Sequence, residues 1–237
     1  MKVIALSSQK GGSGKTTLAG HIAVEAERTG WGPTALIDTD PQGSLADWWN
    51  ERRAQTPLFA HTDISRVRTD LDAMRNSGIK LVIFDTPPAI TGTIETVVRM
   101  TDLVIIPARP SPHDLRAAGA TVEIVERWGK SLCFVINAAT PGARITAEAA
   151  IALSQHGTVA PVTIHGRTDF AASMIDGRTA MELDPNSPSS QEISKLWQYL
   201  SSRLNKGARP TVLNMQSHAP ARRKVFGQRG LATARQS

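Results

Sequence analysis

Cysteine is almost absent from this chain: Cys133 is the only cysteine among 237 residues. A single thiol excludes a disulfide framework within the chain, and it excludes metal and iron–sulfur sites built from several cysteines. Because Cys133 lies in the apolar run 132–136, we expect a buried core thiol. Aromatic residues make up only 5% of the sequence, against 41% hydrophobic residues. The apolar positions are mainly Ala, Val, Ile and Leu, which favours a sheet covered by helices.

Long apolar runs are also missing. None approaches the roughly 20 residues that a membrane-spanning helix needs. The first apolar stretch, 3–6, is soon followed by Lys10 and Lys15, which does not fit a signal peptide. We therefore expect a cytoplasmic protein with no membrane partner. Its length suits one α/β domain over residues 1–205, followed by a tail over 206–237.

Acidic residues are missing from that tail. Its seven basic residues are Lys206, Arg209, Arg222, Arg223, Lys224, Arg229 and Arg235. The rest of the chain carries 20 basic and 21 acidic residues, so the tail accounts for the net charge of +6. Its Gly, Ala, Ser and Gln content predicts disorder. A basic tail on a near-neutral body indicates contact with a polyanion, either nucleic acid or an anionic membrane, and Arg222, Arg223 and Lys224 are the candidates for DNA contact. The alternative is a solubilising extension.

The most informative stretch is residues 10–17, Lys-Gly-Gly-Ser-Gly-Lys-Thr-Thr. It lies between a predicted strand, 3–6, and a predicted helix, 18–27, which is the setting of a phosphate-binding loop. The glycines let backbone N–H groups turn toward an anion, and the helix N-terminus adds partial positive charge. Lys15 would contact the β- and γ-phosphates, and Thr16 would ligate Mg²⁺. The predicted nucleotide-binding residues are Lys10, Gly11, Gly12, Ser13, Gly14, Lys15, Thr16 and Thr17.

Polar residues follow three other predicted strands, at the strand ends where ligands bind in α/β sheets. Asp38 and Asp40 follow the strand 34–37, and Asp85 follows 81–84, where it would hold Mg²⁺ through a water. The alternative for these carboxylates is the capping of a turn or helix. Asn137 follows the strand 131–136 and could hydrogen-bond an adenine edge. A local turn is the alternative for Asn137.

Strand and helix patterns alternate along the whole sequence. Apolar runs at 58–60, 103–106 and 159–164 complete the predicted strands, and the remaining helices are predicted from 44 onward and at 64–74, 91–99, 115–127, 146–155, 170–176 and 190–204. This order predicts an α/β fold with a mostly parallel sheet and helices on both faces. The three prolines between 107 and 112 predict a stiff loop without regular structure.

The motif K-G-G-x-G-K-T-T resembles the deviant Walker A motif of the ParA/MinD family of P-loop ATPases; Gln9 stands where the common P-loop has Gly. The strings D-T-D-P-Q-G at 38–43 and D-T-P-P at 85–88 match switch segments of ParA-like proteins. Residues 38–48 and 101–112 resemble short ParA-type partition ATPases such as ParF. The resemblance implies that Lys10 reaches the ATP of a partner subunit in a sandwich dimer, that Asp40 orients the attacking water and that Asp38 supports Mg²⁺. Residues 107–114 become a candidate dimer surface.

The resemblance also implies a function. An ATP-bound homodimer would bind DNA non-specifically, in association with the nucleoid. A ParB-like or cargo-linked adaptor would stimulate weak ATP hydrolysis and release the dimer, so segregating a plasmid or chromosome or positioning a protein cargo. Arg167 and Arg178 are candidates for DNA phosphates, with surface ion pairs as the alternative. Two other functions stay open: a MinD-like membrane-associated positioning ATPase, and a nucleotide-dependent regulator that only binds.

Overall fold

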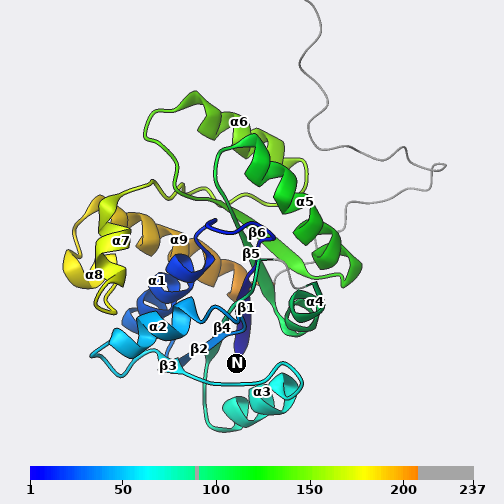
Figure 1. Cartoon of the computed structure of the whole chain (residues 1–237), viewed down its shortest axis with the longest axis vertical. Helices are drawn as coiled ribbons and strands as arrows, with labels where there is room; N and C mark the ends of the chain where they lie inside the picture. The colour runs from blue at the N-terminus through cyan, green and yellow to red at the C-terminus, as the bar shows by residue number, and fades with distance from the viewer. Residues whose placement is uncertain (89–90, 208–237) are drawn as a thin grey trace, which may run out of the picture.

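The computed structural model describes residues 1–88 and 91–207, and the basic tail predicted to be disordered lies almost wholly outside them. Its centre is a six-stranded sheet with the order β3-β2-β4-β1-β5-β6, in which all neighbouring strands are parallel (Figure 1). The strands are β1 (Lys2–Leu6), β2 (Thr34–Asp38), β3 (Leu58–Phe59), β4 (Leu81–Asp85), β5 (Leu103–Ala108) and β6 (Ser131–Ile136). The predicted α/β fold class is confirmed.

Helices cover both faces of this sheet. They are α1 (Lys15–Arg28), α2 (Ser44–Glu51), α3 (Val67–Asn76), α4 (Thr91–Met100), α5 (Pro112–Arg127), α6 (Arg144–Ser154), α7 (Thr168–Met174), α8 (Ala180–Leu183) and α9 (Pro188–Asn205). Apolar residues of α1 and α9 pack on one face of the sheet, together with residues of α2, α7 and α8. Those of α3 to α6 pack on the other face.

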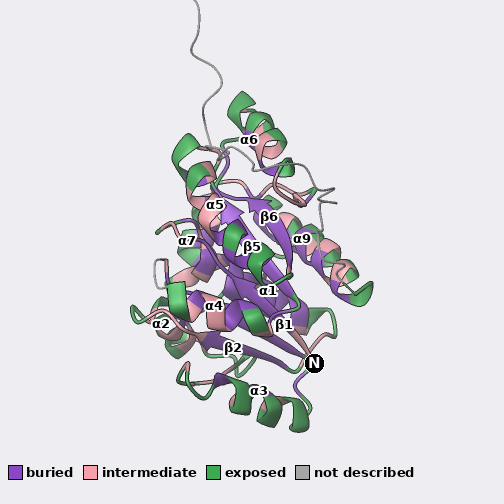
Figure 2. Cartoon of the chain, turned by 90° about the vertical axis from the view of Figure 1, so that its right-hand side faces the viewer, coloured by how far each residue is buried: buried purple, intermediate pink, exposed green. Residues whose placement is uncertain are grey.

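Both faces of the central strands are buried, which explains their continuous apolar runs (Figure 2). Along β1, Ile4 and Leu6 belong to the cluster that contains α1 and α9, whereas Val3 and Ala5 belong to the cluster that contains α3. This alternation is the two-residue period of a strand. The carboxyl ends of β1, β2 and β4 lie side by side, since Leu6 pairs with Asp85 and Asp38 also pairs with Asp85. The motifs predicted at three strand ends therefore meet at one edge of the sheet.

The prediction of a stiff loop over residues 107–112 is wrong at both ends. Pro107 belongs to β5 and pairs with Val135 of β6. Proline has no backbone N–H to donate to a neighbouring strand. It is tolerated at position 107 because β1, the neighbour of β5 on the side away from β6, makes its last pair at Ile105 and needs no hydrogen bond from residue 107. Pro112 is the first residue of α5, where a missing N–H costs nothing, and Ser111 caps the helix by accepting from the Asp114 amide at 3.2 Å. The candidate dimer surface at 107–114 thus contains only a short loop, and Ala108 and Asp114 are buried.

The strand predicted over residues 159–164 is also wrong. This segment runs beside β6, but its only bridge within the described residues is an isolated one between Val159 and Phe134; a second isolated bridge, between Ala139 and His165, lies just beyond both segments. Pro161 interrupts it and has no amide hydrogen to donate to a ladder. The four-residue helix α8 was not predicted, because a single turn leaves no periodic pattern in the sequence.

Candidate nucleotide-binding site

The loop between β1 and α1 has the backbone that its glycines predict. Gly12 and Gly14 adopt left-handed conformations with φ of 70° and 93°, which residues bearing a Cβ rarely adopt. A Cβ on Gly14 would also overlap the Asn137 side chain. Gly14 is the N-cap of α1 and no side chain caps this end, so the first amides of the helix remain available to an anion.

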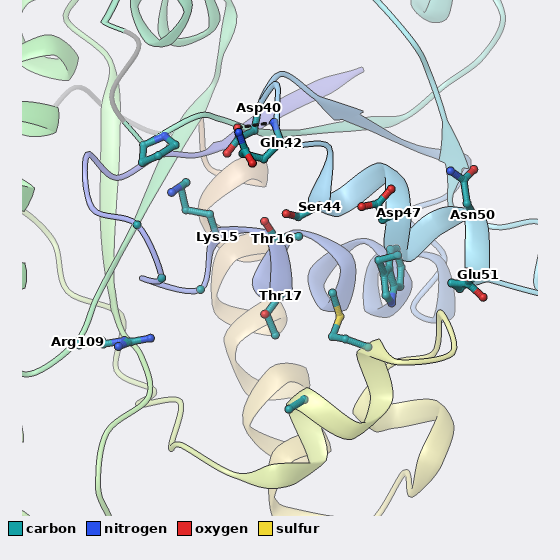
Figure 3. Close-up of a pocket in the computed structure, with 17 residues that line it drawn as sticks. Lys15, Thr16, Thr17, Asp40, Gln42, Ser44, Asp47, Asn50, Glu51 and Arg109 are labelled. Carbon is teal, nitrogen blue, oxygen red and sulfur yellow. Dashed lines mark hydrogen bonds between the residues drawn. The ribbon is translucent and has the colours of Figure 1, made fainter.

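This loop forms one wall of a cavity of about 890 Å³ (Figure 3). The predicted residues that line it are Gly11, Gly12, Gly14, Lys15, Thr16, Thr17 and Asp40. The remaining lining residues are Gln42, Ser44, Asp47, Trp48, Asn50, Glu51, Pro88, Arg109, Ala171 and Met174. The structure therefore brings the phosphate-binding motif and Asp40 together around a space large enough for a small ligand.

Lys15 is buried at the base of the loop, where its Nζ donates to the Lys10 carbonyl oxygen at 3.3 Å. Burial lowers the pKa of Lys15, while the carboxylates of Asp85 and Asp40 act in the opposite direction. A buried ammonium group with few polar partners gains strongly from a negatively charged ligand. This environment suits a phosphate.

Thr16 and Asp85 form the inner part of the site. The Thr16 hydroxyl donates to Asp85 Oδ2 at 2.5 Å, and Asp85 is 1% exposed. The other carboxylate oxygen, Oδ1, is buried with no hydrogen-bond partner among the described residues. Burial raises the pKa of Asp85 to about 7, against the opposing effects of Thr16 and Lys15. A buried carboxylate with a free oxygen, next to a hydroxyl, fits a divalent cation.

Mg²⁺ commonly takes one or two protein oxygens and completes its octahedron with phosphate oxygens and water. Within residues 1–88 and 91–207, no group of three His, Cys, Asp or Glu side chains could hold a metal ion. Thr16 and Asp85 therefore fit Mg²⁺ only as part of a metal–nucleotide complex. Their roles as metal ligands stay predictions.

Asp38 is engaged with the backbone. Its Oδ1 accepts from the Asp40 amide at 2.9 Å, and its Oδ2 accepts from the amides of Leu45 and Ala46 at 3.0 and 3.2 Å. These bonds fix the segment 38–46 and satisfy the N-terminus of α2, which Gly43 leaves without a side-chain cap. Burial is the largest influence on the Asp38 carboxyl and raises its pKa. Its predicted support of Mg²⁺ stays a prediction beside this capping role.

Asp40 lies at the cavity wall, where its Oδ1 accepts from the Gln42 amide at 3.0 Å. Figure 3 shows Asp40 and Gln42 above Lys15, at the upper end of the cavity. Asn137 is buried and its Nδ2 donates to the Ser13 carbonyl oxygen at 2.7 Å. Asn137 thus connects the end of β6 to the loop, and its contact with adenine stays a prediction.

Lys10, Arg167 and Arg178 are predicted site residues that do not line the cavity. Lys10 is not among its lining residues, and its side chain makes no hydrogen bond or ion pair within the part of the chain that the structure describes. Arg167 pairs with Glu192 at 2.7 Å, and Arg178 pairs with Asp176 at 2.7 Å. The surface ion pairs named as their alternative are therefore present, and DNA contact stays a prediction. Arg222, Arg223 and Lys224 lie outside the described residues.

Sequence reasoning missed Arg109 and the acidic residues Asp47 and Glu51 of α2 as cavity residues. Arg109 directly follows β5, so its position after a predicted strand was a usable signal. The strand order, in which β5 lies beside β1, was also needed to place Arg109 next to the phosphate-binding loop. Asp47 and Glu51 read as the polar face of an ordinary surface helix.

Side chains behind the cavity tie α1 and α2 to the segment 173–182. His21 is fully buried; its Nε2 accepts from the Ala180 amide at 3.0 Å, so its Nδ1 carries the proton and donates to the Thr17 carbonyl at 2.7 Å. Trp48 Nε1 donates to the Arg178 carbonyl at 3.0 Å. Arg52 forms a two-point ion pair with Glu182 at 2.7 and 2.9 Å. The elements that border the cavity are therefore held to α8 and to the loop that precedes it.

Comparison with known proteins gives consistent matches. The family described as "CobQ/CobB/MinD/ParA nucleotide binding domain" matches residues 4–206. The chain is 28% identical over 191 residues to the "Maintenance of carboxysome distribution protein A" of Halothiobacillus neapolitanus, covering 76% of this chain and 87% of that protein. It is 28% identical over 132 residues to "Protein ParA" of Rhizobium radiobacter, covering 53% of this chain and 56% of that protein.

The fold is similar to that of the septum site-determining protein MinD of Pyrococcus horikoshii, solved with Mg-ADP. The TM-score is 0.72 at 14% sequence identity, over 88% of this chain and 99% of that chain. This likeness confirms the fold alone. Among the helices that the structure describes, none combines the length and apolar character needed to cross a lipid bilayer.

Proposed function

Because this chain belongs to the CobQ/CobB/MinD/ParA nucleotide-binding family, we propose that it is an ATP-dependent positioning ATPase whose ATP-bound dimer binds DNA non-specifically. The observation that carries the proposal is that Lys15 and Thr16 line one cavity and that the buried carboxylate of Asp85 accepts a hydrogen bond from Thr16. This arrangement provides a buried cation for phosphates and a hydroxyl–carboxylate pair for Mg²⁺, as phosphoryl transfer requires.

Within one subunit, the loop amides and Lys15 would hold the phosphates, and Thr16 and Asp85 would hold Mg²⁺, Asp85 through a water. Mg²⁺ held there would supply charge neutralisation at the phosphates. Asp40 orients the attacking water from the cavity wall, where its carboxylate is already positioned by the Gln42 amide. Asp38 contributes by fixing the backbone of that segment.

Between subunits, Lys10 supplies a positive charge to the nucleotide of the partner. Its side chain is unpaired within the described residues and does not line the cavity of its own chain, which supports a role in trans. Because the partner subunit supplies this cation, the dimer should form only when ATP is bound. The site is complete only in the dimer, so a single subunit should hydrolyse ATP slowly. Together these features make the lifetime of the dimer depend on ATP hydrolysis.

The ATP-bound dimer would attach cargo to DNA for as long as the ATP stays unhydrolysed. A relative named for carboxysome distribution suggests a protein microcompartment as one kind of cargo, and the resemblance of residues 38–48 and 101–112 to partition ATPases suggests a plasmid as another. The basic residues of the tail add phosphate contacts, and an adaptor on the cargo stimulates hydrolysis and releases the dimer. The DNA of the nucleoid would then be the surface on which the cargo is positioned.

Sedimentation with no nucleotide, ADP and ATP tests the nucleotide-controlled dimer. The wild type should dimerise only with ATP and Mg²⁺. Lys15→Ala should lose ATP binding and the dimer, whereas Lys10→Ala should keep ATP binding and lose only the dimer. A dimer that forms equally in all three conditions, or that persists in Lys10→Ala, would contradict this part of the proposal.

A further inference from the structure

Arg109 lies beside the phosphate-binding loop. It is the first residue after β5, and β5 is paired with β1, the strand that leads into the loop. It lines the same cavity as Lys15 and Thr17. In Figure 3, Lys15 and Arg109 lie on either side of the loop that precedes α1, and the guanidinium of Arg109 points into the space below the loop.

The approach to the loop is close. A Cβ built on Gly12 would lie 3.4 Å from Arg109 Nη2, so the guanidinium occupies the space directly against the loop backbone. Gly12 is one of the residues predicted to present its amide to a phosphate. A cation at this position lies near the place where the loop is predicted to bind a negatively charged phosphate.

Arg109 is also unpaired. Its side chain makes no hydrogen bond, ion pair or ring contact anywhere in the ranges 1–88 and 91–207. By contrast, Arg52, Arg127 and Arg167 each meet a carboxylate at 2.7 Å. An exposed guanidinium held against a phosphate-binding loop, without a carboxylate of its own, is available to an anionic ligand.

We propose that Arg109 binds a phosphate group of the nucleotide, as a second cation beside Lys15. This inference rests on nucleotide binding at this loop. The planar guanidinium offers two parallel N–H donors that match two phosphate oxygens, whereas Lys15 offers a single charged point. The phosphate can belong to the nucleotide of the same chain or, in an ATP-bound dimer, to that of the partner; the chemistry is the same.

The test compares Arg109→Gln and Arg109→Lys with a matched control, Arg68→Gln. Arg68 is an exposed arginine of α3 that does not line the cavity. Two quantities are measured on the full chain: the Kd for Mg-ADP by calorimetry, at a protein concentration where sedimentation shows the monomer, and the rate at which a fluorescent AMPPNP analogue leaves the dimer. Because Arg109 has no partner in the described residues, the melting temperature without nucleotide should be unchanged.

If Arg109 contacts the nucleotide of its own chain, Arg109→Gln should weaken ADP binding about 10- to 100-fold, the value of a charge-assisted hydrogen bond, and Arg109→Lys should recover part of this loss. If it contacts the partner's nucleotide, ADP affinity should stay the same and AMPPNP should leave the dimer at least about tenfold faster. Both quantities within about twofold of Arg68→Gln would overturn the proposal.

The outcome is separable from that of the proposed function. Lys15→Ala tests nucleotide binding at the loop without touching Arg109. A wild-type chain that binds ADP but never dimerises with ATP would contradict the proposed positioning function. The ADP comparison would still decide whether Arg109 binds phosphate in its own chain.

Discussion

His21 makes the stability of this protein depend on pH in a way that one substitution can isolate. The imidazole is fully buried between α1 and the start of α8, with its two nitrogens bonded to Thr17 and Ala180. Burial lowers its pKa to about 4; the Thr17 carbonyl and Glu182 oppose this effect, and Arg52 adds to it. The folded protein therefore keeps His21 neutral over a range in which the unfolded chain protonates it.

This difference in pKa between the folded and unfolded chain makes the protein less stable in acid. Below pH 6.5, the ordinary pKa of a histidine side chain, unfolding exposes an imidazole that takes up a proton, so acid favours the unfolded state. At 1.36 kcal/mol for each pKa unit, the free energy of unfolding falls by about 2 kcal/mol at pH 5 and by about 3 kcal/mol near pH 4. Above pH 6.5 this contribution is constant.

His21→Gln removes the titration and keeps an amide that can donate and accept. Urea unfolding, followed by tryptophan fluorescence, gives the free energy of unfolding of both proteins at pH 7.5, 6 and 5. The wild type should be more stable at pH 7.5, and its advantage should shrink by about 2 kcal/mol at pH 5. Other titrating groups, Asp85 among them, act in both proteins and cancel in the difference. A difference that stays constant within about 0.5 kcal/mol would refute the reasoning.

Three further predictions concern the site and its supports. Asp85→Asn should weaken Mg²⁺-dependent ATP binding and abolish hydrolysis, while binding without Mg²⁺ changes less; equal losses with and without Mg²⁺, by calorimetry, would argue against a metal role. Residue 14 has a φ of 93°, which alanine rarely adopts, and a Cβ at this position would overlap the Asn137 side chain. Gly14→Ala should therefore abolish nucleotide binding, and an affinity within about twofold of wild type would contradict the geometry. Arg52→Ala breaks a partly buried pair with Glu182, in which the Arg52 side chain is 3% and the Glu182 side chain 26% exposed, and should cost about 2 kcal/mol in urea unfolding; a loss below about 0.5 kcal/mol would show that the pair is weakly coupled to folding.

The sequence predicts best where local pattern and tertiary packing agree. The strand at 131–136 was placed at its observed bounds, because a run buried on both faces is continuously apolar. The loop with Gly12 and Gly14 was predictable because its positive φ values require glycine. The convergence of Asp38 and Asp85 followed from a general property of parallel sheets, which place strand ends at one edge.

The predictions from sequence fail where contacts between residues far apart in the sequence determine the structure. Pro107 sits in a strand because β1 has already ended beside it, which no local pattern shows. Arg109 reaches the cavity because β5 pairs with β1, and the order of strands along the sheet differs from their order in the sequence. The link from His21 to Ala180 spans 159 residues and rests on a neutral buried imidazole, which reads as an ordinary polar residue in the helix pattern.

The central claim is that ATP controls attachment to DNA. It is tested most directly by measuring binding to a duplex of unrelated sequence, with no nucleotide, with ADP and with ATP, each at two salt concentrations. We predict binding only with ATP and Mg²⁺, a marked loss at higher salt, and no binding by Lys10→Ala. Binding that is equal in all nucleotide states would contradict it, because the basic tail would then bind DNA without any control by the nucleotide site.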